Sequence, residues 1–119
     1  MMDVSIIIVN WNVKDLLDQC LASLYNGSLA ISQPQDQLPV AEIIVVDSAS
    51  SDDSVAMVRA KYPDVRLFAE TENVGFTRGN NLALKEAQGR YLLLLNPDTE
   101  VIDDAILQLI RYMNTHTDV

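Results

Sequence analysis

Apolar residues along the chain gather in four short runs, most of them rich in β-branched side chains. Runs of this length are typical of strands that are buried on both faces of a parallel sheet. The last run is rich in leucine, which favours helix, but it is short and bounded by Gly89 and Pro97, so it predicts a strand. The predicted strands span 4–9, 42–46, 65–69 and 91–95.

Each predicted strand is followed by a segment with apolar residues at helical spacing. In the first, Val13, Leu17 and Leu24 share one face, with Asn12 as the predicted N-cap and Gly27 as the predicted end. The polar stretch between this helix and the second strand contains two prolines and predicts a surface loop. Further helices are predicted before Pro63, over about 77–88, and from about 102 to 113.

Regular alternation of strands and helices predicts an α/β fold, with a parallel sheet of about four strands and helices on both faces. The sequence contains no internal repeat, low-complexity tract or linker. We therefore expect one domain over residues 1–119.

The composition and net charge of the chain narrow the classes of molecule that it can bind. With 49% hydrophobic and 21% charged residues, the chain has the composition of an ordinary globular protein. Its net charge of −9 disfavours binding to nucleic acid and to anionic membrane surfaces. Cys20 is the only cysteine, no apolar run approaches ~20 residues, and the start lacks the basic region of a signal peptide. These features fit a cytoplasmic protein.

Polar residues follow each predicted strand, at the edge where open α/β sheets bind ligands. Asp47 comes directly after the second strand. Its carboxylate could accept hydrogen bonds from a ribose hydroxyl or a base N–H, or it could cap the turn into the next helix. Asp98 follows the fourth strand, where it could hold Mg²⁺ or Mn²⁺ at a diphosphate or make an Asx turn.

In the segment 73–81, Asn73 and Gly75 lie just before a predicted helix. The glycine suggests a positive φ or a close backbone approach. Arg78 could pair with a phosphate, although a lone arginine on a helix is more often simply solvated. Trp11, just past the first strand, could stack on a base or cover the core.

Several enzyme classes are disfavoured by details of the sequence. The segment after the first strand contains no glycine, unlike dinucleotide-binding dehydrogenases, and a P-loop is absent. His116, the only histidine, lies near the end of the sequence, which disfavours a histidine-based triad. Asn96 occupies the nucleophile position of haloacid dehalogenase-type phosphatases, and an amide cannot form their aspartyl-phosphate.

Four motifs in order resemble family 2 glycosyltransferases, and particularly their rhamnosyltransferase-like branch. The opening VSIIIVNWN ends at Asn12, and VDSASSDDS is similar to the family's VDNxSxDGS. NVGFTRGNN resembles NxGFxxxxN, and GRYLLLLNPD resembles the strand that ends in the family's metal-binding Asp-x-Asp region. In this sequence Asn96 replaces the first acid of that region, and Asp53 stands where glycine is common.

The resemblance implies a GT-A fold, of which this chain supplies the Rossmann-like N-terminal part, and a UDP- or dTDP-sugar donor. It places Asp47 at the base or ribose and Asp98 at a divalent metal beside the diphosphate. It implies inverting transfer to a glycan or lipid-linked acceptor, in the cytoplasm or at the inner face of the membrane. The full set of expected nucleotide contacts is Asn10, Trp11, Asn12, Asp47, Asn73, Gly75, Arg78 and Asn96.

In the family the general base lies after the metal-binding region. No residue from 99 to 119 resembles it, since Asp103 and Asp104 fit helix caps. We therefore expect donor binding without transfer from these residues alone. The family's fourth strand is interior and flanked by later strands, so here 91–95 is an expected open edge for a homodimer.

Two other functions remain as alternatives. A sugar-nucleotide nucleotidyltransferase would need a glycine-rich basic loop after the first strand. A non-catalytic α/β interaction domain of the receiver type would need paired acids there.

Overall fold

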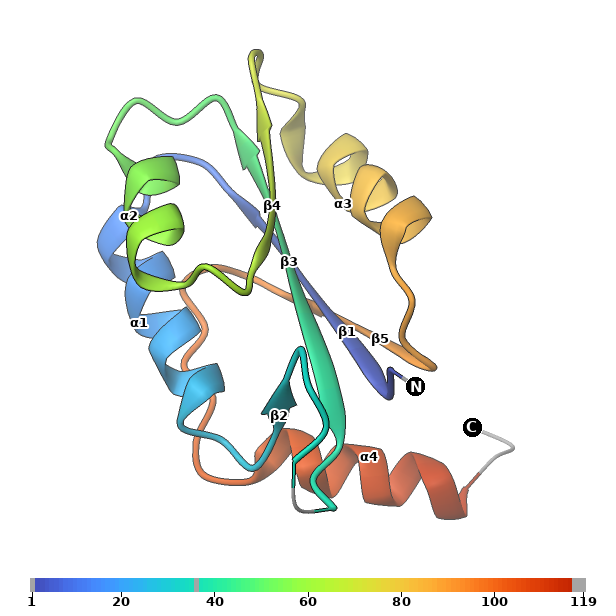
Figure 1. Cartoon of the computed structure of the whole chain (residues 1–119). Coiled ribbons are helices and arrows are strands. Elements are labelled where there is room, and N and C mark those ends of the chain that lie inside the picture. The colour runs from blue at the N-terminus through green and yellow to red at the C-terminus, as the bar shows by residue number, and fades with distance from the viewer. Residues whose placement is uncertain (1, 36, 117–119) are drawn as a thin grey trace.

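The computed structural model describes residues 2–35 and 37–116; residues 117–119 of the predicted domain lie outside this part. Strands and helices alternate as the sequence predicts, with one short strand added (Figure 1). The elements are β1 (Val4–Asn10), α1 (Lys14–Tyr25), β2 (Ala30–Ile31), β3 (Val40–Ser48), α2 (Ser54–Lys61), β4 (Arg66–Glu70), α3 (Gly75–Glu86), β5 (Tyr91–Leu95) and α4 (Ala105–Thr115).

All strands are parallel. β1 is central, with β3 on one side and β5 on the other, and β4 pairs with the far side of β3. These are the four predicted strands. The two-residue β2 pairs with the start of β3 and lies within the stretch predicted to be only a loop.

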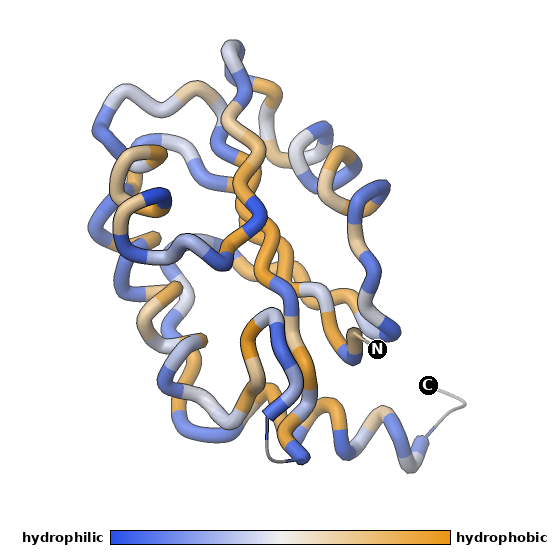
Figure 2. The backbone as a smooth tube through the Cα atoms, viewed as in Figure 1, coloured by the Kyte–Doolittle hydropathy of each residue, from blue (hydrophilic) through white to orange (hydrophobic). Residues whose placement is uncertain are grey.

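Two layers of helix cover the sheet. The larger core lies between the sheet and α1, α2 and α4, and includes Ile6, Leu21, Val58 and Ile110. A smaller core centred on Ile7 lies between the opposite face and α3. Figure 2 shows the hydrophobic colour concentrated in the strands between the helices. The prediction of helices on both faces is therefore confirmed.

The start of α1 differs from the prediction. Val13, not Asn12, occupies the N-cap position, and Asn12 has a left-handed backbone with a φ of 52°. Asp52 takes over the capping role, because its Oδ2 accepts a hydrogen bond from the Lys14 backbone N–H at 2.9 Å. The predicted cap was wrong because the capping group comes from a distant segment.

Gly89 allows the chain to pass very close to β1. A Cβ at this position would lie 2.3 Å from the backbone nitrogen of Ser5 and 2.6 Å from the carbonyl carbon of Val4. Gly89→Ala is therefore expected to destabilise the fold by about 1–3 kcal/mol, because backbone atoms must move to relieve the contact. Urea denaturation measures the change. Gly27→Ala is the matched control, since its nearest contacts are 3.4 Å away, and equal losses in both variants would contradict the steric explanation.

Candidate functional site

The polar residues that follow the strands gather at one edge of the sheet. Parallel pairing places Asn10 opposite Asp47 and, on the other side of β3, Asp47 opposite Ala69. Ile8 pairs with Leu95, so the segment after β5 leaves the sheet near the end of β1. The carboxyl ends of the strands thus bring the four predicted loops to one edge, as expected for a ligand site in an open α/β sheet.

Asp47 is the centre of a buried hydrogen-bond network. It is 2% exposed, and its Oδ1 accepts hydrogen bonds from Asn10 Nδ2 at 3.0 Å and from the Ser50 hydroxyl at 2.8 Å. Its Oδ2 accepts the Ser50 backbone N–H at 2.9 Å, so Asp47 caps the turn toward the next helix, one of the two roles considered from the sequence. The carboxylate is held in one orientation. Asn10 is fully buried, and among the described residues its Oδ1 has no hydrogen-bond partner.

Reciprocal hydrogen bonds join the loop after β1 to the loop after β3. The Asn12 backbone N–H donates to the Ser50 hydroxyl at 2.9 Å, and Asn12 Oδ1 accepts the Ser51 backbone N–H at 2.7 Å. The Asp52 carboxylate accepts hydrogen bonds from the Lys14 backbone N–H, at the start of α1, and from the backbone N–H of Ser54, the first residue of α2. Burial raises the pKa of Asp52, but the hydrogen bonds from Ser54 and Lys14 outweigh it and hold the pKa below its ordinary value.

The third loop is also fixed by hydrogen bonds. The Ser48 hydroxyl donates to Asn73 Oδ1 at 2.8 Å, and the Gly75 backbone N–H donates to the same oxygen at 2.9 Å. Asn73 therefore caps the start of α3. Gly75 has a φ of 75°, as its residue type suggested. Asp53 adopts a φ of 67°, so it has kept the backbone conformation for which glycine is usually selected at this turn.

An open depression of about 360 Å³ lies where the loops after β1 and β5 meet. Trp11, Asn96 and Asp98 line it, together with Val9 and Leu16. The indole of Trp11 is 54% exposed, so its face is accessible to a ligand. Asp98 is exposed as well, in contrast to the buried Asp47.

The matching family model is that of glycosyl transferase family 2, and it covers residues 5–119. The chain belongs to this glycosyltransferase family. The family predicted from the four motifs is therefore confirmed. The match does not test the rhamnosyltransferase-like branch.

Two curated relatives show the range of this glycosyltransferase family. A poly(ribitol-phosphate) beta-glucosyltransferase of Bacillus spizizenii is 33% identical over 93% of this chain and 17% of its own length. The UDP-Glc:alpha-D-GlcNAc-diphosphoundecaprenol beta-1,3-glucosyltransferase WfaP of Escherichia coli is 33% identical over 94% of this chain and 41% of its own length. The chain thus spans less than half of the length of each.

Two solved glycosyltransferases share the fold. TarS 1-349 of S. aureus, in complex with UDP, has a TM-score of 0.80 at 22% identity and covers 98% of this chain and 33% of its own. The mannosyltransferase PcManGT of Pyrobaculum calidifontis, in complex with GDP-Man and Mn²⁺, has a TM-score of 0.65 at 31% identity and covers 80% of this chain and 27% of its own. The expected Rossmann-like part of a GT-A fold is confirmed.

One predicted site residue stands apart from these groups. Arg78 is exposed on α3 and shares no hydrogen bond with another predicted site residue. Within residues 2–35 and 37–116, no three acidic, histidine or cysteine side chains cluster as a metal site, so Asp98 is not part of such a cluster. No helix in the same residues is long and apolar enough to span a membrane.

Sequence reasoning missed the serines that organise the site. Ser48 and Ser50 connect the loops after β1, β3 and β4, but a serine in a polar turn is too common to be singled out. The only available signal was their place within VDSASSDDS, directly after the predicted strand.

Proposed function

We propose that residues 1–119 form the donor-binding part of a glycosyltransferase domain that takes a UDP- or dTDP-sugar. The observation that carries the proposal is the meeting of Asp47, Trp11 and Asp98 at the carboxyl edge of the sheet. The UDP complex of TarS, which shares the fold, supports a pyrimidine nucleotide.

In this proposal the buried network orients the groups that meet the nucleotide. Asp47 retains acceptor capacity toward a ribose hydroxyl or a base N–H, since a carboxylate accepts about four hydrogen bonds. Asn10 is buried against it and fixes its orientation. The exposed face of Trp11 stacks on the base, Asn12 and Asn73 shape the walls, and Gly75 lets the loop approach closely. Asn96 and Arg78 face the phosphates.

Asp98 is the residue that we propose for a divalent metal ion. Mg²⁺ is commonly held by one or two carboxylates together with substrate phosphates, so a single exposed carboxylate fits an ion that arrives with the donor diphosphate. When bound, Mg²⁺ or Mn²⁺ would neutralise the charge that develops on the departing diphosphate. The Mn²⁺ complex of PcManGT supports this choice of ion.

The complete reaction that we propose is inverting transfer of the sugar to an acceptor hydroxyl. The acceptor is a glycan or a lipid-linked glycan in cell-wall or polysaccharide biosynthesis, as the names of the relatives suggest. The protein would act in the cytoplasm or at the inner face of the membrane, where such donors and acceptors meet. A second copy of the chain is a further partner, through the open edge of β5.

Asp98→Ala is expected to remove the effect of Mn²⁺ on UDP binding while leaving the fold intact, because Asp98 is exposed in a loop after β5. Calorimetric titration of UDP with Mn²⁺ and with EDTA measures the effect. Loss of the only carboxylate ligand should weaken metal-supported binding about 10-fold to 100-fold, the range seen when groups supporting a metal site are lost.

Glu100→Ala is the matched control, since it removes a nearby exposed carboxylate with the same change of charge. It should keep the Mn²⁺ effect. Equal UDP affinity with Mn²⁺ and with EDTA in the unmodified chain would contradict the metal role. Absence of binding to any nucleoside diphosphate would contradict the proposed function.

A further inference from the structure

The Ser50 hydroxyl lies where the loops after β1 and β3 meet. It accepts hydrogen bonds from the Asn12 backbone N–H at 2.9 Å and from Asn10 Nδ2 at 3.4 Å. A serine hydroxyl has one proton to donate and two lone pairs that accept. Because both of these neighbours are donors, the proton must point to the third partner, Oδ1 of Asp47, at 2.8 Å. Every hydrogen-bonding position of this hydroxyl is therefore occupied.

Ser50 also holds the second oxygen of the Asp47 carboxylate. Its backbone N–H donates to Asp47 Oδ2 at 2.9 Å. Among the described residues, Oδ1 accepts two hydrogen bonds, from Ser50 and Asn10, and Oδ2 accepts one. A carboxylate accepts about four, so the position that remains for a ligand is on Oδ2. Ser50 thus helps to fix the direction in which Asp47 can accept a further hydrogen bond.

The loop that Ser50 holds carries Trp11. Asn12, directly after Trp11, has a φ of 52°, and Ala49, directly before Ser50, has a φ of 62°. Left-handed backbone costs free energy in residues that have a Cβ, so local preference alone does not maintain these two turns. The hydrogen bond from Asn12 to Ser50 joins them. Without it, the backbone beside Trp11 loses a contact that fixes its position.

We propose that Ser50 is a positioning residue that couples the orientation of the Asp47 carboxylate to the position of the Trp11 indole. Among the hydrogen bonds of the described residues, Ser50 is the side chain that joins Asp47 to the backbone beside Trp11. The inference rests on the proposed donor site, in which Asp47 accepts a hydrogen bond from the nucleotide and Trp11 stacks on its base. A nucleotide that engages one of these residues then favours the bound position of the other.

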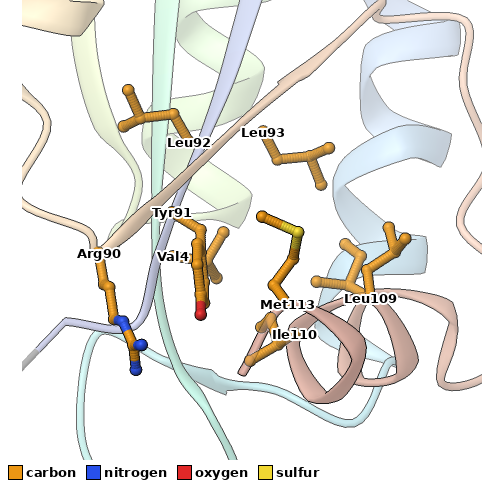
Figure 3. A pocket seen from close by; sticks show the side chains of 9 residues that line it. Val4, Arg90, Tyr91, Leu92, Leu93, Leu109, Ile110 and Met113 are labelled. Atoms are coloured by element: carbon orange, nitrogen blue, oxygen red, sulfur yellow. The ribbon is translucent and has the colours of Figure 1, made fainter. Parts of the chain in front are cut away.

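Trp11 is the only tryptophan in the sequence, so its fluorescence reports on this loop alone. The apolar groove of about 440 Å³ between β5 and α4 is lined by other residues, among them Val4, Tyr91 and Met113 (Figure 3). An apolar molecule in that groove would not contact the indole. The anisotropy of Trp11 and its quenching by acrylamide therefore measure the mobility and accessibility of the site loop in the protein without ligand.

Ser50→Ala is expected to make Trp11 more mobile in the free protein. Its anisotropy should fall and its quenching by acrylamide should rise, because the hydrogen bond from Asn12 loses its acceptor. Asp47→Ala should produce part of the same change, since the Ser50 hydroxyl then loses the partner that fixes it. Combined in one chain, the two changes should have effects that are less than additive. Fully additive effects, or no effect of Ser50→Ala, would overturn the coupling.

The affinity for UDP, measured by calorimetric titration with Mn²⁺, tests the consequence for binding. Ser50→Ala is expected to raise the dissociation constant of UDP about tenfold, a loss typical of a hydrogen bond to a charged group. Ser50→Thr keeps the hydroxyl at a half-buried position and should stay within about threefold of the unmodified chain. Equal losses in the alanine and threonine variants would show that the hydroxyl is not the cause and would overturn the proposal.

Ser51→Ala is the matched control, because it removes a neighbouring hydroxyl that is exposed and lies 3.4 Å from Asn12 Oδ1. The variant keeps the Ser51 backbone N–H, which makes the shorter hydrogen bond to the same oxygen at 2.7 Å. It should leave both the Trp11 fluorescence and the UDP affinity close to those of the unmodified chain. A loss equal to that of Ser50→Ala would overturn the specific role of Ser50.

Failure of the coupling and failure of the donor site give different results. If the unmodified chain does not bind UDP, the donor site is overturned, and the fluorescence of the free protein still decides the coupling. If the unmodified chain binds UDP and Ser50→Ala binds it equally well, the donor site stands and Ser50 is not its positioning residue.

Discussion

Mixed with labelled UDP- and dTDP-sugars, Mn²⁺ and a panel of acceptors, the 119-residue chain is expected to bind donor without forming a glycoside. Transfer requires a general base beside the acceptor hydroxyl, and loss of such a base typically costs about 10²–10⁴-fold in rate. Loss of acceptor positioning removes up to ~7–11 kcal/mol more. Slow hydrolysis of the donor is the most that should be detected.

The structure supports this expectation through the acids that follow β5. The Val101 backbone N–H donates to the Ser23 hydroxyl at 2.9 Å, and the Asp103 carbonyl approaches Gly27. Ser23 lies in the last turn of α1 and Gly27 just beyond it, at the edge of the sheet where the parallel strands begin. Asp103 and Asp104 thus lie at the edge opposite the candidate donor site and cannot act on an acceptor there.

Donor binding must be shown in the same sample by equilibrium dialysis, so that inactivity is not confused with an empty site. A full-length family 2 enzyme, assayed in parallel, is the positive control that shows that the acceptors in the panel can receive a sugar. Glycoside produced by this chain alone would place the base within residues 1–119 and refute the division between donor binding and transfer.

Replacing Glu42 is expected to cause the largest loss of stability. This carboxylate is 3% exposed and accepts hydrogen bonds from the Ser5 hydroxyl at 2.5 Å, the Gln88 backbone N–H at 2.6 Å and Arg66 at 2.9 Å. Glu42→Ala leaves these donors without an acceptor. Breaking a buried pair typically costs 3–5 kcal/mol, and we expect about 3 kcal/mol because Arg66 is partly exposed.

Urea denaturation at several pH values measures this loss and its electrostatic part. Burial raises the pKa of Glu42, but hydrogen bonds from Ser5, Gln88 and Arg66 outweigh it and lower the pKa below its ordinary value of 4.5. The ionised carboxylate therefore stabilises the fold above pH 4.5 and loses this effect as the pH falls through the lowered pKa. The stability difference between the unmodified chain and Glu42→Gln should be largest near neutrality and shrink in acid.

Glu86→Ala is the matched control for Glu42. Glu86 also pairs with Arg66, at 3.4 Å, but its side chain is 48% exposed. Exposed pairs contribute about 0–1 kcal/mol, so this variant should remain close to the unmodified chain. Similar losses in the two variants would show that burial does not determine the effect.

The main strands and helices were predictable because each strand carries an apolar run of about five residues and each helix carries apolar residues at helical spacing. β2 was not, because two residues contain no period, and Ala30 becomes part of a strand only through pairing with Val40. The prediction of the N-cap of α1 was wrong for a related reason. Asn12 is locally a good cap, but its side chain is held by Ser51, and Asp52 supplies the cap from another loop.

Residue types at the candidate site were predictable, but their exposure was not. Asp47 and Asp98 have equivalent positions in the sequence, each soon after an apolar run. The structure distinguishes them, because Asp47 still lies within β3, between two paired strands, whereas Asp98 lies in a turn three residues past the end of β5. The partnership of Glu42 with Arg66 was also hidden, since nothing local shows that a charge inside an apolar run will be buried beside a cation.

The central place of β1 has a consequence for synthesis on the ribosome. β1 is the first of the described strands to be made, yet one of its two neighbours, β5, is the last of them. At 5–20 residues per second, roughly 4 to 17 s separate the end of β1 from the end of β5. During this interval the Ile6–Ile8 backbone has an unpaired side, a template for mispairing between nascent chains. Chaperones that hold extended apolar segments should therefore matter for the yield of this protein.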